Sequence, residues 1–303
     1  MDILGKISKC LSGPNGQSCL LYGAAGSGKS AISHSISEVY AKKGKLAASF
    51  FFSREDDQRS STKDVIATIA YQLAINIPAT KPFICDVLRQ DETILHTVFE
   101  NQLQKLVIEP LFSMPDTDSS WVIVIDALDE CEDIIQMAQH IIAFIAPSSN
   151  RHFPIRFFIT SRPEPRIRAV IENANQNNLL ICYNLLDFEV DTDLRTFLAH
   201  RLQGIHQVRR HVMPGISSPW PPSDTLDTLV RKSSPLFIYA STVVKFVEDE
   251  RAAPEKQLEI VLSIGETPNR RVHADLDQLY QRVLSMSPDC DLLQLVIGTI
   301  IFL

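Results

Sequence analysis

Long apolar runs are absent from this chain. No such run in its 303 residues reaches the roughly 18 residues that a membrane-spanning helix needs. The N-terminus also lacks the order of basic, apolar and small residues that marks a signal peptide. We therefore expect a soluble protein that makes no membrane contact.

Clustered metal-ligand residues are absent as well. The six cysteines contain no Cys-x-x-Cys pair and have no histidine at zinc spacing; they are Cys10, Cys19, Cys85, Cys131, Cys182 and Cys290. This dispersal argues against a zinc site and fits a reducing compartment, so we expect a cytoplasmic protein.

Blocks of like charge are also missing. The 29 basic residues are scattered among 36 acidic ones, and the formal net charge is −7. A nucleic-acid surface would gather basic residues on one face. We therefore expect no nucleic-acid partner.

One motif is present that carries chemistry. It follows the apolar run at residues 19–22 and fits the phosphate-binding pattern Gly-x4-Gly-Lys-Ser; its residues are Gly23, Ala24, Ala25, Gly26, Ser27, Gly28, Lys29 and Ser30. The three glycines allow left-handed or otherwise strained backbone, so that several N–H groups can converge on one anion. The helix that follows adds the positive end of its dipole. This loop predicts binding of a nucleoside triphosphate, with Lys29 on the terminal phosphates and Ser30 on Mg²⁺.

Acidic residues follow a second apolar run, at residues 121–125. Asp126 ends this β-branched stretch, as expected for a buried central strand, and lies where open α/β sheets bind ligands. We expect Asp126 to hold Mg²⁺ directly or through water. Asp129 or Glu130 is then a candidate to polarise the attacking water, although either could instead cap the helix that begins near Asp133.

An arginine follows a third strand-like run, at residues 155–160. Pro163 ends that strand and leaves Arg162 where a neighbouring parallel strand would deliver it to the γ-phosphate. Arg162 could sense this phosphate and stabilise charge during its transfer; the alternative is an ordinary surface arginine.

The spacing of apolar residues along the chain changes near residue 188. Strand-like runs alternate with helix-like segments before that point, at residues 18–22, 46–52, 121–126, 155–160 and 178–183. Helical periods alone follow it, at residues 190–203, 223–231, 235–250, 255–263 and 275–286. The pattern predicts an α/β domain with a parallel sheet covered on both faces, followed by an all-α region.

These features resemble the NACHT class of STAND P-loop NTPases, in particular fungal proteins whose NTPase module is similar to the nephrocystin-3-like N-terminal domain. The resemblance spans nearly the whole chain and includes four short sequence segments outside the phosphate loop, at residues 47–54, 71–73, 125–131 and 159–165. It implies a P-loop NTPase three-layer sandwich over residues 1–188, a helical domain over 189–274 and the truncated start of a winged-helix domain over 275–303. Leu276 to Tyr280 and the apolar tail carry the last of these.

The same resemblance names one residue in the helical region. Residues 234–240 are similar to the segment in which a proline contacts the nucleotide base, so Pro235 is a candidate for that contact. Ser233 and Ser234 stand where the family usually has a glycine. Pro235 could equally be a proline at the first position of a helix.

The function implied is a signalling switch that binds ADP when closed and ATP, favoured over GTP, when open, with Mg²⁺ and slow hydrolysis. Partners would be the nucleotide, further copies of the chain, and effector or repeat domains outside this stretch. Two other functions remain: a constitutive ATPase or GTPase, and an interaction scaffold that retains the fold.

Overall fold

The computed structural model describes residues 3–12, 16–54, 56, 59, 62, 64–114, 120–145, 155–233, 235–264, 274–285 and 290–302. The chain divides into two compact units, Met1–Phe188 and Glu189–Leu303. We describe each unit by itself.

The described part of the first unit contains a five-stranded sheet in the order β2-β3-β4-β1-β5, in which every neighbouring pair is parallel. The strands are β1 (Ser18–Tyr22), β2 (Leu46–Phe51), β3 (Trp121–Asp126), β4 (Ile155–Ser161) and β5 (Leu180–Asn184). Residues that follow β1, β3 and β4 therefore lie at the same end of the sheet, because the carboxyl ends of parallel strands point in one direction.

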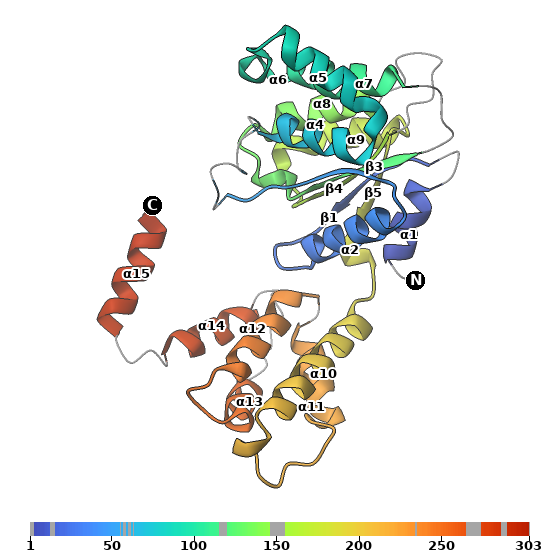
Figure 1. Cartoon of the computed structure of the whole chain (residues 1–303). Coiled ribbons are helices and arrows are strands. Elements are labelled where there is room, and N and C mark those ends of the chain that lie inside the picture. The colour runs from blue at the N-terminus through green and yellow to red at the C-terminus, as the bar shows by residue number, and fades with distance from the viewer. Residues whose placement is uncertain are drawn as a thin grey trace. The chain divides into compact units, whose positions relative to one another are not determined.

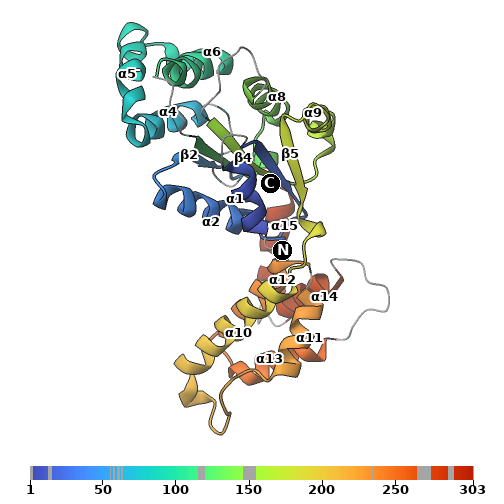
Figure 2. The ribbon, with the colours of Figure 1, turned by 90° about the vertical axis from the view of Figure 1, so that its right-hand side faces the viewer.

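Helices cover both faces of this sheet (Figures 1 and 2). Their bounds are α1 (Ile3–Leu11), α2 (Lys29–Lys42), α4 (Val65–Asn76), η1 (Pro78–Thr80), α5 (Lys81–Gln90), η2 (Ile94–His96), α6 (Phe99–Leu103), η3 (Gln104–Ile108), α7 (Glu109–Phe112), η4 (Leu128–Glu130), α8 (Ile134–Ile145), α9 (Pro165–Gln176) and η5 (Leu185–Asp187). One core packs α1 and α2 against the sheet, and the other packs α4, α8 and α9 against the opposite face.

Strand β3 shows why the sequence builds three layers. Val122 and Val124 belong to the core under α2, whereas Ile123 and Ile125 belong to the core under α4 and α8. Successive side chains of a strand point to opposite faces, so an unbroken apolar run needs cover on both sides. The predicted α/β sandwich with a parallel sheet is confirmed.

Side chains of α4 cover the edge of the sheet formed by strand β2. At the edge strand β2, the backbone N–H of Ser49 donates to Oε1 of Gln72 at 2.8 Å, and Nε2 of Gln72 donates to the carbonyl of Ser49 at 2.9 Å. One turn further along α4, Nδ2 of Asn76 donates to the carbonyl of Ala47 at 3.0 Å. These amides replace the strand that an open edge would otherwise recruit.

The regular secondary structure of the second unit is helical within the residues described. Its helices are α10 (Asp191–Val208), η6 (Arg210–Val212), α11 (Ser223–Ser233), α12 (Phe237–Glu248), α13 (Pro254–Ser263), α14 (Ala274–Ser285) and α15 (Cys290–Phe302). Leu194, Leu198 and Leu202 of α10 recur every fourth residue and are fully buried in its core. Lys232 donates from Nζ to the carbonyls of Val261 and Ile264, where α13 ends. Within the described residues, no helix combines the length and the apolarity that crossing a membrane requires.

Parts of the sequence prediction fall on residues that the structure does not describe. Ser234, residues 265–273 of the predicted helical domain and residues 286–289 of the predicted winged-helix start lie outside the described residues. The identities assigned to residues 189–274 and 275–303 remain predictions.

Candidate functional site

The glycine-rich loop connects the inner strand β1 to the start of α2. Gly26 has φ 72° and Gly28 has φ 99°, the left-handed backbone that glycine adopts without penalty. Gly23 does not have this left-handed backbone, so glycine has another role at that position. A Cβ on Gly23 would lie 3.0 Å from Ser27 Oγ and 3.1 Å from Leu185 Cβ, so close packing is what requires glycine there.

Internal hydrogen bonds hold the loop in a tight turn. Ser27 Oγ donates to the carbonyl of Ala24 at 2.8 Å, and Lys29 Nζ donates to the carbonyls of Gly23 at 2.8 Å and Ala24 at 2.9 Å. Ala25, at the tip of the loop, is exposed.

The N-terminus of α2 is open to an anion. Its N-cap is Gly28 and no side chain caps it, so the first-turn N–H groups have no partner within the helix. Ser30 is exposed on this first turn. Such a helix end combines free N–H donors with a positive dipole end, which suits a phosphate.

Lys29 links the loop electrostatically to the acidic residues predicted to complete the site. Burial lowers the pKa of Lys29; the Asp129 carboxylate raises it, Arg162 lowers it, and Asp126 and Glu130 raise it. These charges follow β4, which pairs with β1, and β3, which pairs with β4, and they lie at the carboxyl end of the sheet, where the loop follows β1. The structure therefore brings together all the site residues predicted in the first unit.

Asp126 ends β3 with only 3% of its surface exposed. Ser33 Oγ donates to Asp126 Oδ1 at 2.7 Å, and Thr160 Oγ1 donates to the same oxygen at 2.5 Å. Thr160 Oγ1 in turn accepts the backbone N–H of Ala127 at 3.0 Å. Ala127 has a left-handed φ of 54°, an unusual conformation for a residue with a side chain, and it turns the chain sharply after the strand.

Sequence reasoning missed Ser33 and Thr160. Ser33 lies four residues after Lys29, on the same face of α2. Thr160 follows Ile159, which pairs with Ile125, so the register places Thr160 level with Asp126. Helical spacing and strand register were the signals that could have found them.

The acidic pair lies in the short helix η4, and the two carboxylates differ in burial. The Asp129 side chain is 1% exposed and that of Glu130 is 24% exposed. The backbone N–H of Arg162 donates to Asp129 Oδ1 at 2.8 Å, and Arg162 Nε lies 3.1 Å from Asp129 Oδ2. Arg162 Nη2 reaches Glu130 Oε1 at 3.4 Å. These contacts, rather than caps on α8, are what the two acids make.

Arg162 follows β4, as predicted, and its side chain is 43% exposed. Its guanidinium is engaged with both acids, so it is more than an isolated surface arginine. Whether it also contacts a phosphate stays a prediction.

Pro235 belongs to the second unit and is half-buried. Helix α12 begins at Phe237 with Leu236 as its N-cap, so Pro235 precedes the helix by two residues. The alternative of a proline at the first helical position is therefore wrong. Contact with a nucleotide base stays a prediction.

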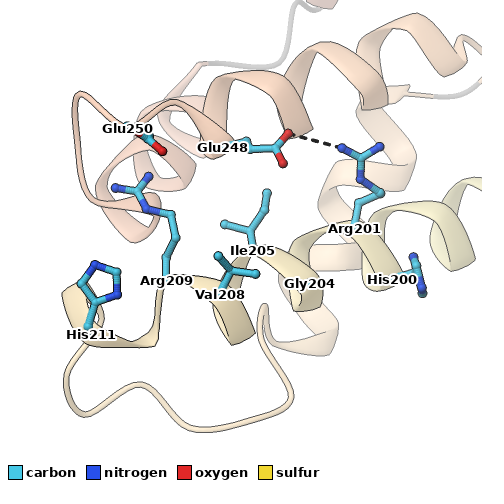
Figure 3. Close-up of a pocket in the computed structure, with 9 residues that line it drawn as sticks. All are labelled: His200, Arg201, Gly204, Ile205, Val208, Arg209, His211, Glu248 and Glu250. Carbon is cyan, nitrogen blue, oxygen red and sulfur yellow. Dashed lines mark hydrogen bonds and ion pairs between the residues drawn. The ribbon is translucent and has the colours of Figure 1, made fainter.

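A cavity of about 610 Å³ lies in the second unit, against α10 and the end of α12 (Figure 3). Arg201, Glu248 and Gly204 are among the residues that line it, and an ion pair of 3.3 Å joins Arg201 and Glu248. None of the predicted site residues lines this cavity.

Comparison with known proteins identifies the family. The model of the family described as nephrocystin 3, N-terminal, matches residues 5–162, which is just over half of the chain. The chain belongs to this family. The match spans the glycine-rich loop, Asp126, the acidic pair and Arg162, so these residues are elements of a nephrocystin 3 N-terminal domain.

More distant similarities add nothing to this. No curated protein matches at a significant level. Among solved structures, the Orc1 protein of Aeropyrum pernix, in a complex with DNA, matches with 14% identity and a TM-score of 0.46, over 94% of this chain and 67% of that chain. A similarity this weak carries no argument about ligand or partner.

Proposed function

We propose that this nephrocystin 3 N-terminal family member binds a nucleoside triphosphate with Mg²⁺ at the loop Gly23–Ser30. The observation that supports this most is the loop itself. It combines two left-handed glycines with an uncapped helix N-terminus whose N–H groups can bind an anion, and the ammonium of Lys29 bonds to the carbonyl of Gly23 in the same loop. A lysine or arginine that binds phosphate through its charge alone does not require left-handed glycines or an uncapped helix N-terminus.

The residues beside the loop fit Mg²⁺. Both hydroxyl groups that bond to Asp126 bond to Oδ1, which leaves Oδ2 as the oxygen that can hold the cation or one of its waters. Ser30, on the first turn of α2, would supply a hydroxyl ligand. Hard oxygen ligands of this kind, few in number and completed by phosphate and water, are typical of Mg²⁺ sites.

The two acids would have different roles in slow hydrolysis. Asp129 is buried and both of its oxygens face the backbone or side chain of Arg162, so it fixes the turn after β4. Glu130 is more exposed and makes longer contacts, of 3.4 and 3.2 Å. Glu130 is therefore our candidate for polarising the attacking water, and Arg162 for sensing the γ-phosphate.

The wider role would be that of a NACHT-type STAND switch in a fungal, cytoplasmic protein. ATP, favoured over GTP, would stabilise an open state and ADP a closed one, with Arg162 and Pro235 making the contacts that differ. A coupling of about 1–3 kcal/mol would be enough for regulation. Residues 275–303 would begin a winged-helix domain, and effector or repeat domains and further copies of the chain would be the partners.

Calorimetry with the purified chain tests the nucleotide site. Mg²⁺ with ADP, ATP or GTP should bind the unaltered chain, whereas Lys29→Ala and Asp126→Ala should abolish binding. Unchanged affinity in either variant would refute the assignment of that residue. Turnover assays test the switch: slow hydrolysis with retained ADP supports it, and rapid multiple turnover contradicts it in favour of a constitutive enzyme.

A further inference from the structure

Arg54 lies beside the acidic pair on the side opposite Arg162. Strand β2 ends at Phe51, which pairs with Asp126, and the N–H of Phe52 donates to the carbonyl of Asp126 at 3.1 Å. The chain after β2 therefore runs alongside the turn after β3. Because β3 lies between β2 and β4, one arginine reaches this turn from each neighbouring strand.

Arg54 makes two contacts with the turn. Its Nη2 donates to the backbone carbonyl of Asp129 at 2.8 Å, and its backbone N–H donates to Glu130 Oε2 at 3.2 Å. Arg162 bonds to the other oxygen of Glu130, Oε1. Each oxygen of the Glu130 carboxylate therefore accepts from a different segment. Oε1 accepts from the segment after β4, and Oε2 accepts from the segment after β2.

The contacts of Arg162 and Arg54 with Glu130 differ in the movement that would break them. Arg162 contacts Glu130 through the end of a long, partly exposed side chain, which can rotate away. Arg54 contacts Glu130 through a backbone N–H, and its guanidinium anchors the peptide group that carries Glu130. Movement of Arg162 would therefore free Oε1 while the backbone N–H of Arg54 kept Glu130 in place.

We propose that Arg54 is a positioning residue, which fixes the turn at Asp129 so that Glu130 stays oriented when Arg162 moves. This rests on the proposed function, in which Glu130 polarises the attacking water. A catalytic group must be held within a fraction of an ångström, and a displacement of about 1 Å can cost about 100-fold in rate. The exposed location of Arg54 makes its substitution compatible with folding.

Three variants test the proposal. Arg54→Met keeps the aliphatic stem but removes the donors, and Arg54→Lys keeps the charge and one possible donor. Arg89→Met is the matched control, because Arg89 is an exposed arginine on α5 whose side chain pairs with Asp86 at 3.1 Å. The readouts are single-turnover hydrolysis of Mg-ATP, the Kd for ADP, and hydrogen exchange of residues 127–131 in the ligand-free chain.

We expect Arg54→Met to slow hydrolysis by about 10- to 100-fold while the Kd for ADP changes by less than about twofold. Exchange should accelerate in residues 127–131 and nowhere else, and Arg54→Lys should recover part of both effects. In a Glu130→Gln background, Arg54→Met should slow hydrolysis no further, because residues that act as a unit are not additive.

Two results for Arg54→Met would overturn the proposal. One is Arg54→Met behaving like Arg89→Met in both hydrolysis and exchange. The other is a parallel loss of ADP affinity with faster exchange throughout the first unit, which would mean a general structural role. If Glu130→Gln alone leaves hydrolysis unchanged, the proposed role of Glu130 fails, and Arg54 as its positioning residue fails with it. The exchange data would then show whether the Arg54 contact exists.

Discussion

Arg162 and Asp129 are joined twice, by the backbone N–H of Arg162 to Oδ1 at 2.8 Å and by Nε to Oδ2 at 3.1 Å. The first bond does not depend on the arginine side chain. Asp129 can therefore keep the turn after β4 in place even when the guanidinium moves. This separation of backbone and side-chain roles underlies the first two predictions.

Asp129→Asn and Glu130→Gln should have opposite profiles. Asn at position 129 weakens bonds to a buried, charged acceptor, so we expect the free energy of unfolding to fall by about 1–3 kcal/mol in urea titrations. Gln at the more exposed position 130 should change stability by less than about 0.5 kcal/mol. It should slow single-turnover hydrolysis by about 100-fold or more, as expected for loss of a general base. Greater hydrolytic loss in Asp129→Asn without loss of stability would reverse our assignment of the two acids.

Arg162→Ala should spare ADP and weaken the triphosphate. A charge-assisted hydrogen bond is worth about 1.5–3 kcal/mol, so removing the guanidinium should raise the Kd of a non-hydrolysable triphosphate by roughly 10- to 100-fold. The Kd of ADP, measured by calorimetry in parallel, should stay within about threefold because ADP lacks the γ-phosphate. Equal losses for both nucleotides would count against a sensor.

Gln72→Ala should destabilise the first unit. It leaves the backbone N–H and carbonyl of Ser49 without their partners, at a cost of about 1–3 kcal/mol. Gln72→Glu should be intermediate, since a carboxylate can accept from the N–H of Ser49 but cannot donate to its carbonyl. Gln136→Ala, at an exposed position in the first turn of α8, is the control and should be nearly neutral. Equal midpoints for the two alanine variants in thermal unfolding would contradict the pairing.

Gly23→Ala and Gly204→Ala should differ in sign. At Gly23 a new Cβ meets Ser27 and Leu185 at 3.0–3.1 Å, so the loop must shift, and we expect about 1–3 kcal/mol of lost stability together with weaker nucleotide binding. At Gly204, inside α10, a Cβ meets nothing within 4 Å. Alanine there should stabilise the helix by about 0.5–1 kcal/mol. Unfolding curves of both variants decide the matter.

Local patterns in the sequence predicted most of the sheet. The bounds predicted for β1 and β3, residues 18–22 and 121–126, are those observed, because each contains an apolar run that stops at Gly23 or Asp126. Helices α10 to α14 begin and end within a few residues of the predicted periods, except that α10 extends to Val208, and no predicted period corresponds to α15. Both signals are contained in a short window of chain, which is why they can be read without a structure.

Contacts between distant segments could not be predicted in the same way. Gln72 belongs to residues 71–73, a segment that resembles the family, but its bond to Ser49 depends on how α4 packs against the edge strand β2. Arg54 and Arg162 lie 75 and 33 residues from Asp129, and only the strand order brings them to it. The pattern indicated that acids and arginine belong to one site, but not that they pair with one another.

The amides of Gln72 and Asn76 have a consequence for assembly. A second copy, or any extended peptide, finds the backbone of Ala47 and Ser49 already occupied and cannot add a strand there unless α4 detaches. Copies that associate on this side must therefore do so through side chains of intact helices. Early docking of α4 during folding would protect the newly formed sheet from joining another molecule's sheet.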